Sequence, residues 1–331
     1  MSAAPLTDWT RLSLDHLRGT RVLVTGGAGF IGGHLANALV TLGAHVTVID
    51  DLSGGGDGSS LPPAVKFVRG SITDRRLLDE LVAGCRFVFH QAALGSVPRS
   101  VEQPQLYYDV NVTGTLNVLE AARKAKVQRV TFAASSSCYG DNPTLPKTES
   151  MATSPLSPYA ANKVADEALM QAWAHSYGVD TACLRYFNIF GPRQSPDNAY
   201  AAVIAAFAKA LVFGKRPTIF GDGEQSRDFT YVDNAVLANL LATRIDKPLL
   251  GAPINIACGI RVSVNELAKE MADLLGHPEL TPIYKEERAG DVKHSLADLS
   301  RANEVLGYKP IVGFREGLAS TVSWYKTALK P

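Results

Sequence analysis

A tyrosine and a lysine four residues apart, Tyr159 and Lys163, form the pattern with the clearest chemical use in this sequence. They lie in the segment S-P-Y-A-A-N-K at the start of an expected helix, where residues i and i+4 share one face. The lysine ammonium group is then close to the phenol. A free tyrosine titrates at about 10, and a neighbouring cation lowers that pKa by favouring the phenolate. The pattern therefore predicts a base that is usable near neutral pH.

A run of serines provides hydroxyl groups for the same chemistry. Ser135, Ser136 and Ser137 directly follow an expected strand, in the sequence A-S-S-S-C-Y-G. Ligands of open parallel sheets bind where the strands end. A hydroxyl at this position can hydrogen-bond both a substrate and Tyr159. Taken alone, each pattern is equally typical of a serine-rich turn or a solvated helix face, so the interpretation depends on their order along the chain.

A glycine-rich turn precedes both patterns. Gly26, Gly29 and Gly32 lie between an expected strand and helix, in T-G-G-A-G-F-I-G. Such a turn brings the backbone close to a pyrophosphate and directs a helix N-terminus at its charge. The next expected strand ends in Asp50, whose carboxylate can accept both hydroxyls of an adenosine ribose and would repel a 2′-phosphate. Because residues 51–60 contain no Lys or Arg, the sequence favours NAD over NADP. The positive nicotinamide ring would add to the effect of Lys163 on the Tyr159 pKa.

Alternating strands and helices must position these groups. Strands are expected at 21–25, 45–50, 65–68, 86–90, 129–133 and 181–186, and helices at 30–42, 74–83, 105–124 and 159–177. Beyond residue 186, Gly and Pro interrupt the pattern, and helices are expected near 199–213, 232–246, 263–275 and 314–328. The alternation predicts an α/β fold. Residues 1–186 would form a Rossmann-type doubly wound parallel sheet, joined by a later strand or two, and residues 187–331 a smaller C-terminal substrate-binding lobe.

Composition excludes several classes of protein. The 331 residues include 33 Lys plus Arg and 32 Asp plus Glu, which gives a net charge of +1. With no basic run, nucleic acid is not expected as a partner. The longest apolar run, 199–208, is too short to span a bilayer, and the first twenty residues lack the pattern of a signal peptide. The four scattered cysteines show no metal-binding spacing. We therefore expect a cytoplasmic protein with no metal site and no membrane attachment.

The motifs together resemble the extended short-chain dehydrogenase/reductase family, and within it the nucleotide-sugar 4-epimerases. The resemblance covers residues 21–310. The matching segments are T-G-G-A-G-F-I-G, H-Q-A-A from His90, N-V-T-G-T from Asn111, S-S-S-C-Y-G, S-P-Y-A-A-N-K, L-R-Y-F-N-I-F-G-P-R from Leu184, R-D-F-T-Y-V from Arg227 and R-A-G-D-V-K-H-S-L-A-D from Arg288. One departure is Gly70-Ser71-Ile72, where the family often has G-D-I beside the adenine.

The resemblance implies a role for each matching position. Ser135, Tyr159 and Lys163 would be catalytic, and Asn111 would support them. The residues implied in NAD binding are Gly26, Gly29, Phe30, Ile31, Gly32, Asp50, Asp51, Ser71, Ile72, Gln91, Ala92, Ala93, Asn111, Tyr159, Lys163 and Tyr186. Those implied in binding a UDP-sugar are Ser96, Ser136, Ser137, Asn188, Ile219, Phe220, Arg227, Arg288, Asp291 and Ser295. Arg227, Arg288 and Asn188 would hold the diphosphate, Ile219 and Phe220 the uridine, and Asp291 its ribose. The resemblance also implies a homodimer formed through a four-helix bundle from the helices near 105–124 and 159–177.

The turn after the serines narrows the reaction. Related dehydratases have an Asp-Glu pair there and decarboxylases a Glu, whereas this chain has Ser136, Ser137 and Cys138. This favours 4-epimerisation through a transient 4-keto sugar, with tightly bound NAD. Ser295 stands where glucose-restricted relatives have a tyrosine, which leaves room for a 2-acetamido group and predicts UDP-N-acetylglucosamine as substrate, with UDP-glucose left open. Alternatives are a UDP-hexuronate 4-epimerase, which Arg99 would favour, an NAD-dependent nucleotide-sugar dehydrogenase or reductase, and a non-catalytic dinucleotide-binding module.

Overall fold

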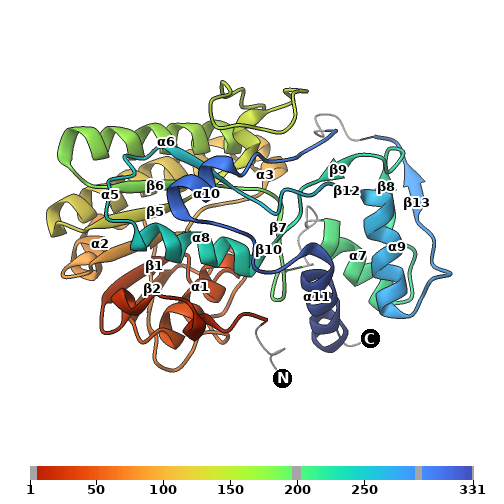
Figure 1. The fold of residues 1–331 in the computed structure, drawn as a ribbon, viewed down its shortest axis with the longest axis horizontal. Helices are drawn as coiled ribbons and strands as arrows, with labels where there is room; N and C mark the ends of the chain where they lie inside the picture. The colour runs from red at the N-terminus through yellow and green to blue at the C-terminus, as the bar shows by residue number, and fades with distance from the viewer. Residues whose placement is uncertain (1–5, 196–202, 288–292, 330–331) are drawn as a thin grey trace.

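A seven-stranded parallel sheet forms the centre of the computed structural model, which describes residues 6–195, 203–287 and 293–329 (Figure 1). The strand order is β11-β6-β5-β4-β1-β2-β3. The bounds are β1 (Arg21–Thr25), β2 (His45–Asp50), β3 (Lys66–Arg69), β4 (Phe87–His90), β5 (Arg129–Ser135), β6 (Thr181–Tyr186) and β11 (Pro253–Ile256). The order reverses between β1 and β4, and in doubly wound sheets ligands bind at the carboxyl ends of the strands beside such a reversal.

Helices cover both faces of the sheet, as the apolar strands require. On one face lie α2 (Arg75–Val82), α5 (Gly114–Ala125) and α6 (Pro158–Tyr177), and on the other α1 (Phe30–Thr41) and α8 (Val232–Arg244) (Figure 1). Alternate side chains of β1 serve the two cores: Val22 and Val24 pack with Leu35 of α1, while Leu23 packs with Leu119 of α5. The predicted Rossmann-type sheet is confirmed.

The C-terminal part has a hydrophobic core of its own, separate from the two cores on the faces of the sheet. It contains α7 (Val203–Val212), α9 (Val264–Leu275) and α11 (Phe314–Ala328), together with three short strand pairs. The pairs are β7 (Ile189–Phe190) with β10 (Thr230–Tyr231), β8 (Thr218–Phe220) with β13 (Ile283–Lys285), and β9 (Ser226–Arg227) with β12 (Val262–Ser263). Phe190, Phe229 and Phe314 meet within this core. The boundary at residue 186 stays a prediction, because α8 and β11 follow it in sequence yet pack with the central sheet.

Some elements differ from the sequence expectation. The helix expected at 105–124 is divided into α4 (Pro104–Tyr108), a π-helical turn (Asp109–Thr113) and α5. The sequence did not predict α3 (Val97–Glu102) or α10 (Ser300–Leu306), which are only six and seven residues long. Short 3-10 turns lie at Trp9–Arg11, Asp15–Leu17 and Ser136–Tyr139. Among the helices of the described residues, none is long and apolar enough to cross a membrane.

Candidate active site

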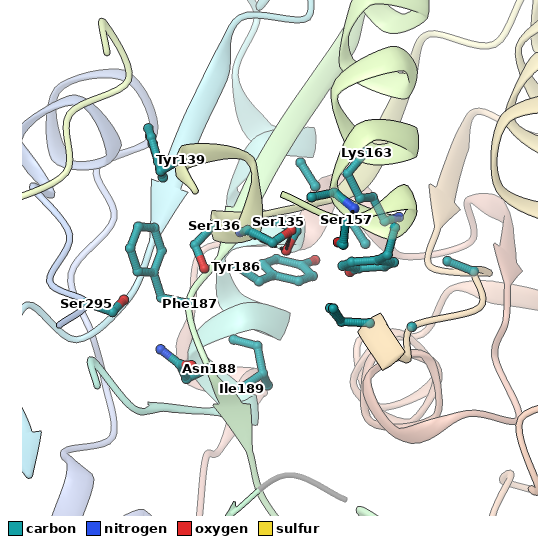
Figure 2. Close-up of a pocket in the computed structure, with 18 of the residues that line it drawn as sticks. Ser135, Ser136, Tyr139, Ser157, Lys163, Tyr186, Phe187, Asn188, Ile189 and Ser295 are labelled. Carbon is teal, nitrogen blue, oxygen red and sulfur yellow. Dashed lines mark hydrogen bonds between the residues drawn. The ribbon is translucent and has the colours of Figure 1, made fainter. Parts of the chain in front are cut away.

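A cavity of about 770 Å³ lies at the carboxyl ends of the central strands. Its sheet wall is built from β5, α6 and the segments beside them, and carries Ser135, Tyr159 and Lys163. Its loop wall carries Arg227, together with Asn188 and Ser295 (Figure 2). Thirteen of the predicted site residues line it: Phe30, Ile31, Gln91, Ala93, Ser135, Ser136, Ser137, Tyr159, Lys163, Tyr186, Asn188, Arg227 and Ser295. No Asp or Glu lines this cavity among the residues that the structure describes.

The start of α6 positions the predicted base. Ser157 caps the helix, because its hydroxyl accepts a hydrogen bond from the Ala160 N–H at 3.1 Å. The N–H of Tyr159 donates to the Ser100 hydroxyl of α3 at 3.1 Å, which fixes the first turn from outside the helix. One turn later, Lys163 is 2% exposed, and its Nζ lies 4.5 Å from the centre of the Phe132 ring and 6.0 Å from that of Tyr159. The two side chains thus share a helix face, with Lys163 buried and Tyr159 half-buried at the cavity.

Burial dominates the electrostatics of this pair. Burial raises the pKa of Tyr159 above its ordinary 10, and a hydrogen bond with Ser135 lowers it only in part. Burial lowers the pKa of Lys163, while Asp166 and Glu167 raise it. The expected fall of the Tyr159 pKa toward neutrality relies on the positive nicotinamide ring of NAD as well as on Lys163, and it stays a prediction.

The serine turn supplies a directed hydroxyl. Ser135 ends β5 and accepts hydrogen bonds from the N–H of Ser137 at 3.2 Å and from its hydroxyl at 2.9 Å. With both of these bonds donated to it, the Ser135 hydroxyl keeps its own proton for another acceptor in the cavity. The ring of Tyr139 leaves the turn toward the interior, where its hydroxyl donates to Asn255 at 2.7 Å.

The glycine turn after β1 has the shape of a phosphate cradle. Gly26 has φ of +67°, and a Cβ on Gly32 would lie 2.2 Å from the Gly26 carbonyl oxygen. Gly29 begins α1 without a side-chain cap, so the N–H groups of the first turn stay available to an anion. Asp50 braces the turn: one carboxylate oxygen accepts from the Ala28 N–H at 3.0 Å and the other from the Leu52 N–H at 2.8 Å. Burial raises the pKa of Asp50.

Other residues predicted to bind a cofactor have mainly structural contacts. Asn111 is 1% exposed and lies in the π-helical turn, where its side-chain amide accepts from the Leu94 N–H at 2.8 Å and donates to the Leu94 carbonyl at 3.2 Å. Ser71 accepts from the Thr73 N–H, and Asp51 from the Ser53 N–H, within their own turns. Ile72 is 4% exposed. The Ala92 N–H donates to Thr25 at 3.2 Å.

Gln91 and Tyr186 belong to a polar cluster at the floor of the cavity. The Tyr186 hydroxyl donates to the Gln91 side-chain oxygen at 3.2 Å, and the Gln91 amide donates to Asn239 at 3.1 Å. Asn239 also donates to the Tyr186 hydroxyl at 2.6 Å. Asn239 lies on α8, and no sequence motif around it indicates a role at the cavity. Only the folding of α8 onto the sheet brings it to this cluster.

A buried carboxylate organises the loop wall. Asp228 is fully buried and accepts hydrogen bonds from the N–H groups of Cys258, Gly259 and Ala297 at 3.1, 3.1 and 3.2 Å. Burial raises the pKa of Asp228 to about 6, although these bonds lower it. Its neighbour Arg227 donates to the carbonyls of Ser226 and Lys293. Asp228 therefore ties together the loops that border Arg227 and Ser295.

Two further contacts shape the loop wall. Asn188 has a positive φ of +39°, and its amide donates to the Asp228 carbonyl at 3.2 Å. Left-handed backbone is unusual outside glycine and is often found at functional positions. The Ser295 N–H donates to the Ser226 carbonyl at 3.0 Å, which holds this small side chain at the cavity edge.

Several predicted substrate residues lie elsewhere. Ile219 is 1% exposed inside the C-terminal core, so its side chain is turned away from solvent, while Phe220 borders a separate depression with Tyr284, Lys285 and Glu286. Ser96 caps α3 by accepting from the Arg99 N–H at 3.4 Å. Arg99 itself is exposed and does not line the cavity. Arg288 and Asp291 lie outside the described residues.

Sequence reasoning missed Lys147. This residue is 3% exposed, lines the cavity and donates to the Asn142 carbonyl. Backbone bonds join it to a distant segment, from the Lys147 N–H to Leu296 at 2.7 Å and from the Asp298 N–H to Lys147 at 2.9 Å. No local pattern could reveal this position, because the pairing joins residues about 150 apart in the sequence.

Comparison with known proteins places this geometry in a family. Residues 22–257 match the model of the NAD dependent epimerase/dehydratase family. This chain belongs to that family. It is similar to the UDP-glucose 4-epimerase of Mycolicibacterium smegmatis, with 39% identity over 314 residues, 92% of this chain and 98% of the relative. Its fold is similar to UDP-N-acetylglucosamine 4-epimerase from Methanobrevibacter ruminantium M1 in complex with UDP-N-acetylmuramic acid, with TM-score 0.89, 39% identity and coverage of 94% and 99%.

The cofactor of this epimerase/dehydratase family member is NAD. A similar structure, UDP-glucuronic acid 4-epimerase from Bacillus cereus, was solved with a fluorinated UDP-glucuronic acid and NAD. Its TM-score is 0.86 at 31% identity, with coverage of 93% of this chain and 100% of that chain. The residues here fit the cofactor, because Gly26 and Gly32 allow a turn too tight for any side chain and Gly29 leaves the helix N-terminus uncapped for an anion. The predictions of the family and of NAD are confirmed.

Proposed function

We propose that this protein interconverts UDP-N-acetylglucosamine and UDP-N-acetylgalactosamine by 4-epimerisation through a transient 4-keto sugar, with NAD retained throughout. The observation that carries the proposal is the set of groups around the cavity: one phenol beside a hydroxyl and an ammonium, and no carboxylate among the described lining residues. Epimerisation removes and returns one proton and one hydride, so one acid–base group is enough. Elimination of water must also take a second proton and protonate the leaving hydroxyl, which needs further acid–base groups.

Each wall of the cavity has a separate task in this reaction. The glycine turn with Gly26, Gly29 and Gly32 would hold NAD, which would supply the acceptor and donor of a hydride at C4. Tyr159 takes the proton from the sugar O4 as a base and gives it back as an acid, and the Ser135 hydroxyl holds O4 by a hydrogen bond. The Lys163 ammonium stabilises the phenolate. Arg227 and Asn188 hold the diphosphate, which leaves the sugar free to turn about its linkage and present its opposite face.

The small residue at position 295 supports the acetylated substrate. Ser295 is half-buried at the cavity edge, and Figure 2 shows it near Phe187, on the far side of the labelled residues from Lys163. A hydroxymethyl group leaves space there that a larger side chain would fill. A 2-acetamido group adds three heavy atoms beyond a hydroxyl, so steric room at this position sets the choice between acetylated and plain sugars.

The test is epimerisation by the purified protein with no added NAD. UDP-N-acetylglucosamine and UDP-glucose are supplied in parallel, and NMR follows the configuration at C4. We expect the acetylated sugar to convert faster, with no net production of NADH and no dehydrated product. Conversion of neither sugar, or loss of water from either, would contradict the proposal.

A second candidate substrate is a UDP-hexuronate, and the observation that favours it is Lys147. This buried cation lines the cavity, whereas Arg99, the cation that the sequence suggested, does not. A carboxylate at C5 of the sugar would gain a charge-assisted partner in Lys147. UDP-glucuronate is therefore the third substrate in the assay. If it is preferred, Lys147→Met should abolish that preference and leave UDP-glucose turnover in place.

The proposal includes a homodimer in a cytoplasmic setting. Exposed apolar side chains lie on the helices that the family resemblance assigns to a four-helix bundle: Leu106 and Tyr108 on α4 and Tyr177 at the end of α6. Burial of such side chains against a second copy would remove them from water. Light scattering after gel filtration checks this, and a monomeric mass would contradict it.

A further inference from the structure

Asp166 is a buried carboxyl that the proposed reaction does not use. It lies on α6 three residues after Lys163 and has no exposed surface. Neither of its oxygens has a hydrogen-bond partner among the described residues. Buried polar groups are nearly always hydrogen-bonded, and a buried charge without a partner is costly. A residue kept in this position therefore requires an explanation beyond packing.

The neighbouring acid on α6, Glu167, is already paired with an arginine. Glu167 is bound on both oxygens by Arg185, from Nε at 2.8 Å and from Nη2 at 2.7 Å, with both side chains almost fully buried. In a bidentate ion pair of this kind, the guanidinium neutralises the charge of the carboxylate. Asp166 has no such cation, so among the acids of α6 it is the one whose charge is left to act on Lys163. Accordingly, Asp166 is the largest influence that raises the Lys163 pKa, and Lys163 is the largest that lowers the Asp166 pKa.

The other charged and titratable groups around the pair come from every element packed against it. They are Tyr159 and Glu167 on α6, Cys183 and Arg185 on β6, His90 on β4, Tyr107 on α4 and Cys138 in the serine turn. Burial opposes the ionised form of Asp166, Lys163 and Tyr159 alike. The Asp166 charge favours the ammonium of Lys163 and disfavours the phenolate of Tyr159.

A line of hydrogen bonds leads from Thr115, which lies beside Asp166, to the glycine turn. The Thr115 hydroxyl of α5 lies close enough to lower the pKa of Asp166, and it pairs with His90 Nε2 at 2.9 Å. His90 Nδ1 pairs with the Thr25 hydroxyl at 2.7 Å, and Thr25 also accepts from the Ala92 N–H. Burial lowers the pKa of His90 to about 3, so the ring is neutral and has one donor and one acceptor nitrogen.

The charge of Asp166 depends on pH. Burial raises the Asp166 pKa from 3.8 to about 7, while Lys163 and Thr115 lower it. At the alkaline pH at which a lysine loses its proton, Asp166 is therefore ionised, and its charge is present to act on Lys163.

We propose that Asp166 is a positioning residue for the active site: its ionised carboxyl, buried on α6 three residues after Lys163, keeps Lys163 protonated. The inference rests on the proposed function for its meaning, because there the Lys163 ammonium stabilises the Tyr159 phenolate. Asp166 touches neither substrate nor cofactor and acts through Lys163. The neutral variant Asp166→Asn keeps the shape of the side chain and removes the charge.

The experiment measures protonation of Lys163 directly. The NAD-loaded protein is exposed to a trace amount of acetic anhydride at a series of pH values, and mass spectrometry quantifies labelling at Lys163. We expect the pH of half-maximal labelling to fall by about one unit in Asp166→Asn, because one unit corresponds to one nearby charge in a partly dry site. Thr115→Val should give a smaller fall in the same direction. Asp233→Asn, which neutralises a buried carboxyl on α8 outside the cavity lining, should give none.

The outcomes separate this inference from the proposed function. Unchanged Lys163 labelling in Asp166→Asn overturns the inference, whatever sugars the protein converts. Shifted labelling without conversion of any UDP-sugar overturns the proposed function and leaves the role of Asp166 intact. If conversion occurs, both limbs of the pH profile of kcat should move to lower pH in Asp166→Asn, because Lys163 and Tyr159 both become more acidic. A merely structural defect would lower kcat without moving the profile. Should Asp166→Asn fail to fold, the smaller shift in Thr115→Val decides the question.

Discussion

The two walls of the cavity are built by different means. The sheet wall presents Ser135, Tyr159 and Lys163 from the end of β5 and the first two turns of α6, elements held by local caps and by the central sheet. The loop wall presents Arg227 and Ser295 from short two-residue strands and loops, held by backbone bonds to distant segments and by Asp228. Regular elements place the reacting groups, whereas long-range ties place the groups that select the sugar. Mutations in the two walls should therefore affect different quantities.

The largest expected effect is that of Tyr159→Phe in the sheet wall. The phenylalanine ring keeps the packing but has no proton to exchange with O4, so kcat should fall about 10³-fold, within the range for loss of a general base. Binding of UDP, measured by calorimetry, should change less than about twofold. Comparable loss of UDP binding would show that the two walls do not act separately. Tyr177→Phe, which makes the same change at an exposed tyrosine near the end of α6, is the matched control.

The next effect concerns selectivity in the loop wall. Ser295→Tyr should reduce kcat/KM for UDP-N-acetylglucosamine about 100-fold relative to UDP-glucose, because forcing bulk into a filled site costs about 1–3 kcal/mol. The rate with UDP-glucose should stay within a few-fold of the wild type. Ser295→Ala serves as the control, since it removes the hydroxyl without adding volume. An equal loss for both sugars would mean that position 295 does not face the 2-substituent.

A smaller effect is expected from Asp228→Asn beneath the loop wall. The amide nitrogen of asparagine in place of Oδ2 cannot accept from the Ala297 N–H, whereas the Gly259 N–H keeps its second acceptor, Oδ1, at 3.2 Å. One tie is therefore broken, at a cost of about 1–3 kcal/mol. We expect the KM for the UDP-sugar to rise about tenfold while kcat changes little. A fall in kcat with unchanged KM would contradict the division of tasks. The Asp233→Asn variant again controls for loss of a buried carboxyl.

The smallest effect is a difference in pH dependence of stability. Burial raises the Asp228 pKa to about 6 from an ordinary 3.8, so between these values the folded protein keeps a proton that the unfolded chain releases. Stability from this group is complete at low pH and falls as pH rises through that window, by about 1.4 kcal/mol per unit at most. The Tm of the wild type should therefore fall by a few degrees relative to Asp228→Asn from pH 4 to 6. A constant difference across that window would contradict the raised pKa.

The sequence predicts the sheet wall of the cavity better than the loop wall. The sheet, the glycine turn, and the meeting of Ser135, Tyr159 and Lys163 follow from local periodicity and from the rule that ligands bind at strand ends. The effect of burial on the Tyr159 pKa did not follow, because burial is a property of the folded chain. Lys147 and Asn239 reach the site through contacts between residues far apart in sequence, and no local pattern reports them.

The late position of β11 has a consequence for how the chain folds. This strand, Pro253–Ile256, pairs with β6, and α8 covers one face of the sheet, yet both follow most of the short strands of the loop wall in sequence. During synthesis, β6 has an open edge until residue 256 leaves the ribosome, about seventy residues after β6 itself is complete. Such a long-range closure is slow and exposes an unpaired edge meanwhile. A fragment that ends at residue 186 would carry Ser135, Tyr159 and Lys163 and still leave the β6 edge unpaired, so we expect it to aggregate.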